Sequence, residues 1–240
     1  MKHILLAATA IALTLAACER REPAPPADPA AQAPQPAAPA PAVPAQPAPP
    51  AATPAPTPPA PEPQATDKWR DYAKPADVDR LSRLTGAWGS SLAKARDTGH
   101  GAELARLGAL VDPKAATLAN PHPGPGAYRC RTVKLGGGVG FVTYPWFKCE
   151  IELTPGGDLI LRKLTGSQRQ EGMFYPDTDR RLVYLGGQAW GADEARASRY
   201  GDVVQRDQIG VLERIGDQRW RLAMPWSRTE SDLDLLELAR

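Results

Sequence analysis

Residues 147–157 read Phe-Lys-Cys-Glu-Ile-Glu-Leu-Thr-Pro-Gly-Gly. Apolar and charged side chains alternate over the first seven positions, which is the period-two pattern of a strand with one buried face. Pro155 and Gly156 then stand where a type II turn places proline and glycine. The segment predicts a half-buried strand that runs into a hairpin, and therefore an antiparallel sheet.

Similar short segments recur from residue 127 to residue 238. Strands are expected at 127–135, 146–153, 159–164, 168–175, 182–185, 209–215, 218–224 and 233–238. About eight strands with hairpin-length connections predict an up-and-down barrel or a strongly curled sheet, with a β-sandwich as the alternative. The glycine run 136–140 lacks the Gly-Lys-Ser/Thr ending of a phosphate-binding loop, so we interpret it as a flexible hairpin loop.

Residues 69–111 have a helical pattern instead. Apolar residues recur every three or four positions after Pro75 and before Gly99: Val78, Leu81, Leu84, Trp88, Leu92 and Ala95. A shorter stripe follows at Leu104, Leu107 and Val111. The sequence therefore predicts an α+β domain at 67–240, in which two N-terminal helices (75–111) pack on the strands and Trp88 belongs to the core.

The first eighteen residues have the three zones of an export signal. A basic start with Lys2 leads into an apolar run too short to span a bilayer comfortably, and the run ends at Cys18. Residues 15–18, Leu-Ala-Ala-Cys, resemble the lipobox of bacterial lipoproteins. That resemblance implies cleavage before Cys18, lipidation of its thiol, and attachment to a membrane. Glu19 is not aspartate, which by the same resemblance favours the outer membrane of the cell envelope, on its periplasmic side.

Residues 19–66 are dominated by proline and alanine. From residue 22 onward this segment holds 18 of the chain's 27 prolines. It has no apolar periodicity, so it cannot bury enough surface to offset backbone ordering. We interpret it as an extended, disordered tether between the lipid and the domain.

Two cysteines remain, Cys130 and Cys149. A pair of cysteines in an exported domain predicts a disulfide rather than a metal or redox site, since His122 is the only histidine nearby.

Neither composition nor motifs indicate an enzyme. Residues 67–240 hold 26 Lys and Arg against 23 Asp and Glu, so no nucleic acid is expected as partner. No catalytic, cofactor-binding or metal motif is found, and no cofactor is expected. Carboxylates such as Glu171 and Asp177 leave one enzymatic alternative open, a hydrolase that uses a carboxylate pair.

Residues 187–205 are the segment most suited to binding. They are long for a hairpin connection, and long loops on a rigid scaffold often hold binding residues. The candidates are Trp190, Arg196, Arg199 and Tyr200, because arginine and aromatic side chains anchor many interfaces. The favoured interpretation is a short solvated helix at 192–199, with Trp190 and Tyr200 packed back on the barrel.

Several blocks resemble an uncharacterised family of Gram-negative periplasmic proteins, catalogued only as a domain of unknown function. They lie at 128–136, 147–149, 165–169, 184–186, 210–214 and 219–222. The resemblance covers most of 67–240 and implies no activity.

A second resemblance is to small lipoprotein inhibitors of lysozyme. Those barrels insert a Ser-Gly loop, followed by tyrosine, into the enzyme's cleft. Here the order is Gly166-Ser167, and Arg169 is nearby in place of the tyrosine. This resemblance makes Ser167 and Arg169 candidate contact residues.

The preferred interpretation is a non-enzymatic envelope lipoprotein that binds a ligand, an envelope protein or the cell wall. Inhibition of an envelope-directed hydrolase such as lysozyme is the first alternative, and the carboxylate hydrolase is the second.

Replacing Cys18 should detach the protein from the membrane. The Cys18→Ala variant lacks the thiol that accepts the lipid, so we expect it in the soluble periplasmic fraction after cell fractionation. Membrane association equal to that of the unaltered chain would contradict the anchor.

Overall fold

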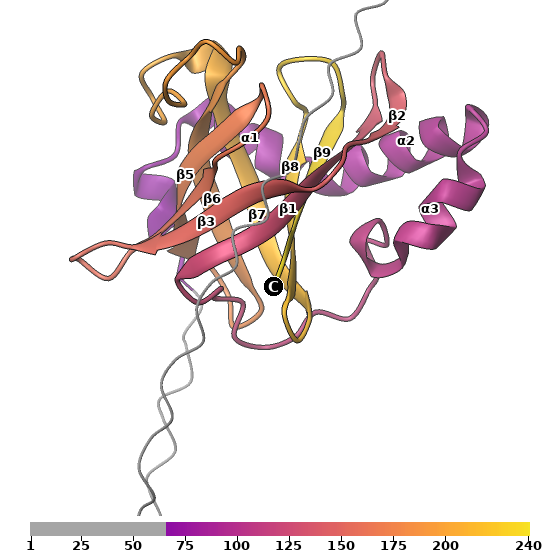
Figure 1. Cartoon of the computed structure of the whole chain (residues 1–240). Coiled ribbons are helices and arrows are strands. Elements are labelled where there is room, and N and C mark those ends of the chain that lie inside the picture. The colour runs from indigo at the N-terminus through magenta and orange to yellow at the C-terminus, as the bar shows by residue number, and fades with distance from the viewer. Residues whose placement is uncertain (1–65) are drawn as a thin grey trace, which may run out of the picture. The chain divides into compact units, whose positions relative to one another are not determined.

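In the computed structural model, which describes residues 66–240, helices precede strands (Figure 1). The α-helices of the described residues are α1 (Pro75–Ser82), α2 (Leu84–Asp97) and α3 (Gly101–Leu107). The strands are β1 (Gly126–Gly136), β2 (Gly140–Thr143), β3 (Phe147–Leu153), β4 (Leu159–Lys163), β5 (Arg169–Pro176), β6 (Arg181–Ala189), β7 (Asp207–Gly216), β8 (Arg219–Pro225) and β9 (Leu233–Ala239). No described helix is both long and apolar enough to cross a membrane. Cys18 and residues 19–65 lie outside the described part.

Eight antiparallel strands close into a barrel. The order is β2-β1-β3-β4-β5-β6-β7-β8-β9, and β1 also pairs with β9. This closing ladder runs from Arg129↔Ala239 to Leu135↔Leu233. Among the described strands β2 pairs only with β1, so it stays outside the ring. The predicted α+β fold with an antiparallel barrel is confirmed.

The first predicted helix is divided into two. It breaks at Arg83, because the two halves pack on different parts of a curved wall. Val78 and Leu81 of α1 contact the apolar cluster that includes Ile209. Trp88 of α2 is buried in a second cluster over β1, β8 and β9, as predicted for a core residue. Helices α2 and α3 lie on one side of the barrel, at the right of Figure 1.

One strand, β2, was missed and another, β6, was predicted too short, in both cases because of glycines. β2 follows the run 136–140, which forms the turn of the β1–β2 hairpin. Strand β6 continues through Gly186 to Ala189, although the pattern predicted its end at residue 185. A Cβ at Gly186 would lie 2.2 Å from the Tyr184 hydroxyl, and its cross-strand partner Gly172 is equally crowded. These glycines make room for the Tyr184 ring inside the barrel.

One half of the barrel interior is filled with apolar side chains. Tyr128, Leu161, Tyr184 and Leu222 belong to this cluster. It also contains the predicted Cys130–Cys149 disulfide, which is confirmed, with 5.8 Å between the two Cα atoms. Closing a loop of this length stabilises the fold by about 3 kcal/mol, mainly by restricting the unfolded chain.

The segment before β1 covers this apolar end. The Trp220 indole N–H donates a 2.9 Å hydrogen bond to the carbonyl oxygen of Pro121. The Tyr128 hydroxyl donates a 2.7 Å bond to the carbonyl oxygen of Gly124. We call this the closed end, because two aromatic side chains of the core, Trp220 and Tyr128, are hydrogen-bonded to the segment that lies across it.

Candidate functional site

Four connections meet at the opposite end, which we call the barrel mouth. They are residues 137–146, which include β2, and residues 164–168, 190–206 and 226–232. In Figure 1 the orange loop and the yellow loop at the top are the last two. The hairpin connections at the closed end, 154–158, 177–180 and 217–218, are shorter than most of those at the mouth. The longest loops of the barrel therefore gather on one face.

The barrel interior becomes polar toward the mouth. Side chains alternate across each strand, so the inward row of the core cluster continues to the mouth. There it holds Thr132, Lys134, Lys163, Gln170, Gln188 and Asp234, all of them buried. Lys134 is the cross-strand partner of Asp234, and Gln170 is that of Gln188. Burial of such groups costs free energy unless they find partners, so this cluster is the unusual feature of the core.

A pocket opens beside this cluster because β1 changes its partner. Strand β1 pairs with β3 up to Cys130 and with β2 from Val133 onward. The opening has a volume of about 90 Å³. Its lining is Thr132, Lys134, Tyr144, Phe147, Lys163, Ser167, Gln168 and Gln170. We call it the lysine pocket.

The two lysines of the pocket have different partners. The Lys134 ammonium contacts the Glu230 carboxylate at 2.5 Å and the Gln168 side-chain oxygen at 2.8 Å. The Lys163 ammonium donates to the Gln168 backbone carbonyl at 2.6 Å and lies 4.1 Å from the centre of the Phe147 ring. Within residues 66–240 it forms no ion pair with a carboxylate. Burial, and then the charges of Arg169 and Lys134, lower the pKa of Lys163 to about 8.

Two further polar groups complete the layer. Gln170 is 2 % exposed, and its side-chain oxygen has no hydrogen-bond partner among the described residues. Asp234 accepts a hydrogen bond from the Ser231 hydroxyl, and burial raises the pKa of its carboxyl. The layer thus contains both an uncompensated cation and an unpaired amide oxygen.

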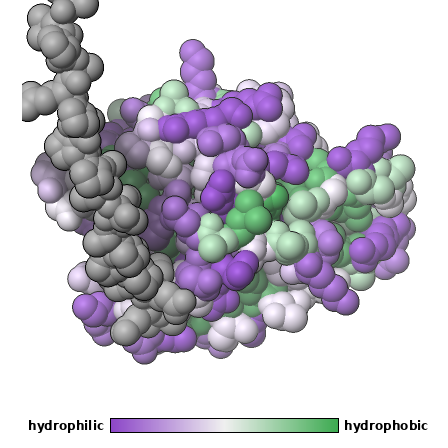
Figure 2. Space-filling view, turned by 90° about the horizontal axis from the view of Figure 1, so that it is seen from below, coloured by the Kyte–Doolittle hydropathy of each residue, from purple (hydrophilic) through white to green (hydrophobic). Residues whose placement is uncertain are grey.

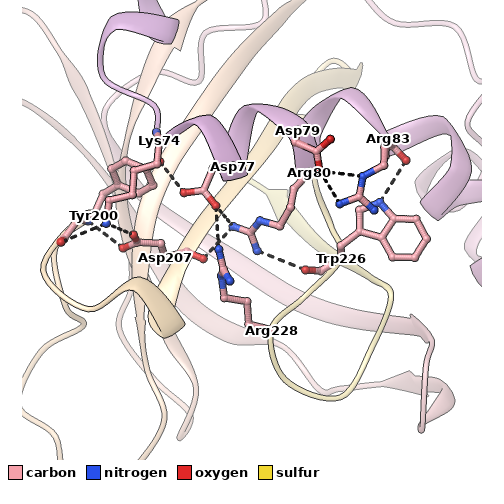
Figure 3. Close-up of polar contacts among 10 residues, drawn as sticks. Lys74, Asp77, Asp79, Arg80, Arg83, Tyr200, Asp207, Trp226 and Arg228 are labelled. Carbon is pink, nitrogen blue, oxygen red and sulfur yellow. Dashed lines mark hydrogen bonds and ion pairs between the residues drawn. The ribbon is translucent and has the colours of Figure 1, made fainter.

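A network of buried charges holds the mouth loops to α1 (Figure 3). The Asp77 carboxylate pairs with Arg80 at 2.8 Å and with Arg228, and it accepts a 2.6 Å bond from the Tyr200 hydroxyl. Lys74 pairs with the buried Asp207 at 2.8 Å. Breaking a buried pair costs about 3–5 kcal/mol, so these contacts fix the positions of 190–206 and 226–232.

Comparison with known proteins identifies the family but no activity. A family model described as "Domain of unknown function (DUF4893)" matches residues 69–238. The chain belongs to this family. The resemblance to a family catalogued only as a domain of unknown function is therefore confirmed. No curated protein and no solved structure matches the chain.

The DUF4893 domain brings three of the predicted contact residues to the lysine pocket or to the depression beside it. Ser167 is exposed and lines the lysine pocket. Arg169 and Arg196 line an adjoining depression that shares Lys163 and Gln170 with this pocket. Arg169 donates to the carbonyl oxygens of Gly166 and Glu194, so it joins two mouth loops.

The other candidates, Trp190, Arg199 and Tyr200, lie on the 190–206 loop. Trp190 is 41 % exposed, and Arg206 lies over its ring. Arg199 is exposed. Tyr200 is half-buried and supports the loop through Asp77; burial and this hydrogen bond raise its pKa. Tyr200 therefore holds the mouth in shape rather than facing a partner.

The predicted helix at 192–199 was wrong, since these residues form no helix in the DUF4893 domain. The Glu194 side chain accepts hydrogen bonds from the backbone N–H groups of Trp190 and Gly191, at 2.7 and 2.9 Å. It also pairs with Arg206.

Sequence reasoning missed Lys134, Lys163 and Gln170. A usable signal was present, because Lys134 continues the inward series Tyr128, Cys130, Thr132 by the period of two. Charged residues on strands normally face solvent, so the alternation alone does not identify a buried lysine.

Replacing Lys163 by methionine should stabilise the fold at neutral pH. The pKa of Lys163 is about 8 in the folded chain against 10.5 when unperturbed. Below pH 8 the folded state bears the full cost of the buried charge. Between pH 8 and 10.5 the unfolded state binds more protons, so stability rises with pH and the cost fades. Lys163→Met should gain on the order of 2 kcal/mol at pH 7 and little at pH 10.5.

Urea unfolding of both chains at the two pH values measures this difference. Lys148→Met is the matched control, because Lys148 is exposed on the neighbouring strand β3. If Lys163→Met changed the free energy of unfolding equally at both pH values, the buried charge of Lys163 would not be what destabilises the fold.

Proposed function

We propose that this chain is an envelope-anchored lipoprotein whose barrel is a non-enzymatic binding domain. Lipid on Cys18 attaches it to the membrane, and residues 19–66 hold the barrel away from the surface. The barrel mouth is its binding face, and its partner is the cell wall or an envelope protein. The chain lies on the periplasmic side, anchored in the outer membrane.

The difference between the two barrel ends carries this proposal. The closed end is filled by apolar side chains and covered by its own chain. The mouth combines the long loops with buried, incompletely paired polar groups. Figure 2 is seen from below Figure 1 and so shows the side away from the mouth loops, where apolar residues lie among polar ones. Polar groups that converge in a concave place are the usual mark of a binding site.

The disulfide supports the proposed location. Disulfides form and persist in oxidising compartments, and the Cys130–Cys149 bridge is fully buried. An exported domain meets this condition, in agreement with the signal-like residues 1–18.

Photo-crosslinking in cells tests the binding face. A photoreactive amino acid at position 190, 41 % exposed at the mouth, should give adducts with an envelope protein or the cell wall. The same residue at position 153, 53 % exposed at the closed end, is the matched control. Equal adducts from both positions, or none from position 190, would reject the mouth as the binding face.

Inhibition of a hydrolase such as lysozyme is a second candidate, and one observation favours it. Ser167 is exposed on the connection between β4 and β5, at the rim of the lysine pocket. An exposed serine on a barrel loop is what the resemblance to the lysozyme inhibitors requires. The carboxylate hydrolase has no such support, since Glu171 and Asp177 both pair with arginines.

A lysis assay separates the inhibitor from the general binding domain. The full chain should protect bacterial cell walls from lysozyme, and Ser167→Ala should remove most of that protection. Ser90→Ala, an exposed hydroxyl on α2, is the control. Lysis at the same rate with and without the chain would exclude the inhibitor.

A further inference from the structure

The lysine pocket has a charge balance that points to one kind of ligand group. Glu230 already neutralises Lys134 at 2.5 Å. Lys163 has only the Gln168 carbonyl and the Phe147 ring as partners among residues 66–240. Arg169, the next cation, is bound to two backbone carbonyls. Lys163 is therefore a buried cation of the pocket without a carboxylate partner among the described residues, and an anion can neutralise it.

The lining supplies donors around that charge. Thr132, Tyr144 and Ser167 bring hydroxyl groups, and Gln170 brings an amide. Gln170 is 2 % exposed, and its side chain lines the pocket. Its amide N–H groups can donate to an anion. Charge-assisted hydrogen bonds to an ionised oxygen are about twice as strong as neutral ones.

The size of the pocket limits what can enter. Its 90 Å³ is below the roughly 150 Å³ of a cavity that holds benzene, and far below the roughly 300–1,000 Å³ of whole-ligand sites. A single functional group fits, while the remainder of a larger molecule lies outside across the rim, where Tyr144 and Ser167 are found.

We propose that the lysine pocket binds the terminal carboxylate of a larger ligand, with Lys163 as its counter-ion and Gln170 and Ser167 as donors. The inference rests on the barrel mouth being the binding face, and it names the group that this face recognises. A carboxylate carries one negative charge, which matches the one lysine of the pocket lining that has no carboxylate partner among the described residues. A phosphate carries nearly two charges and a third acceptor oxygen, for which this pocket has no second uncompensated cation.

Calorimetric titration of the full chain in detergent tests the assignment. The probes are N-acetyl-Ala-Ala with a free carboxylate, the same dipeptide as its C-terminal amide, and inorganic phosphate. The free acid should bind, with the amide and phosphate each about tenfold weaker or more, since one charged contact is worth about that factor.

Variants place the binding in the pocket. Lys163→Met should weaken the free acid about tenfold or more, and Gln170→Leu should weaken it several-fold without loss of fold. Lys148→Met, the exposed control on β3, should bind as the unaltered chain does. Unchanged affinity in Lys163→Met, or an amide that binds as well as the acid, would overturn the proposal. Phosphate binding tighter than the acid would overturn the choice of carboxylate.

Failure of the carboxylate pocket and failure of the proposed function give different results. If no anion binds but position 190 still gives adducts in cells, the carboxylate pocket is wrong and the binding face stands. If the free acid binds through Lys163 but position 190 gives no adducts, the pocket stands and the envelope partner is wrong.

Discussion

The pairing of β1 decides both the fold and the site. On one edge this strand closes the barrel against β9. On the other edge it is shared, first with β3 and then with β2. The disulfide from Cys130 to Cys149 lies where the pairing with β3 ends, so it holds the two strands together at the point where they separate. The lysine pocket is the space that this separation opens on the mouth side.

The buried polar groups at the mouth lower the stability of the fold. Buried lysines and amides would be replaced by apolar residues if a well-filled barrel were the only requirement, because apolar packing in such positions is commonly neutral or stabilising. The closed end shows that this chain can fill a barrel with aromatic and aliphatic side chains. A polar layer retained at one end alone is expected where it serves recognition, since natural proteins depart from consistent packing mainly at functional sites.

The strands were predictable where one face is buried and the period of two is unbroken, as in 147–153. The pattern failed where glycines interrupt it, at β2 and at the end of β6, because their role depends on neighbours such as Tyr184 that are distant in sequence. The break at Arg83 reflects barrel curvature, which no local pattern contains. Ser167 was found by resemblance and Trp190 by loop length. Lys163 was not found, because only closure of the barrel turns its side chain from a solvent-facing charge into a buried one.

Side-chain contacts hold the 190–206 loop in shape without an α-helix. Its side chains bind other parts of the domain. Tyr200 donates a hydrogen bond to Asp77 of α1, and Glu194 binds the backbone N–H of Trp190 and the side chain of Arg206. Helix α1 is thus the support of the mouth as well as a cover for the barrel wall. A loop held by buried charges loses little further freedom when a partner binds, and such preorganisation favours affinity. The side chains left exposed at the mouth include Trp190, Arg196 and Ser167, which lie around the lysine pocket and the depression beside it.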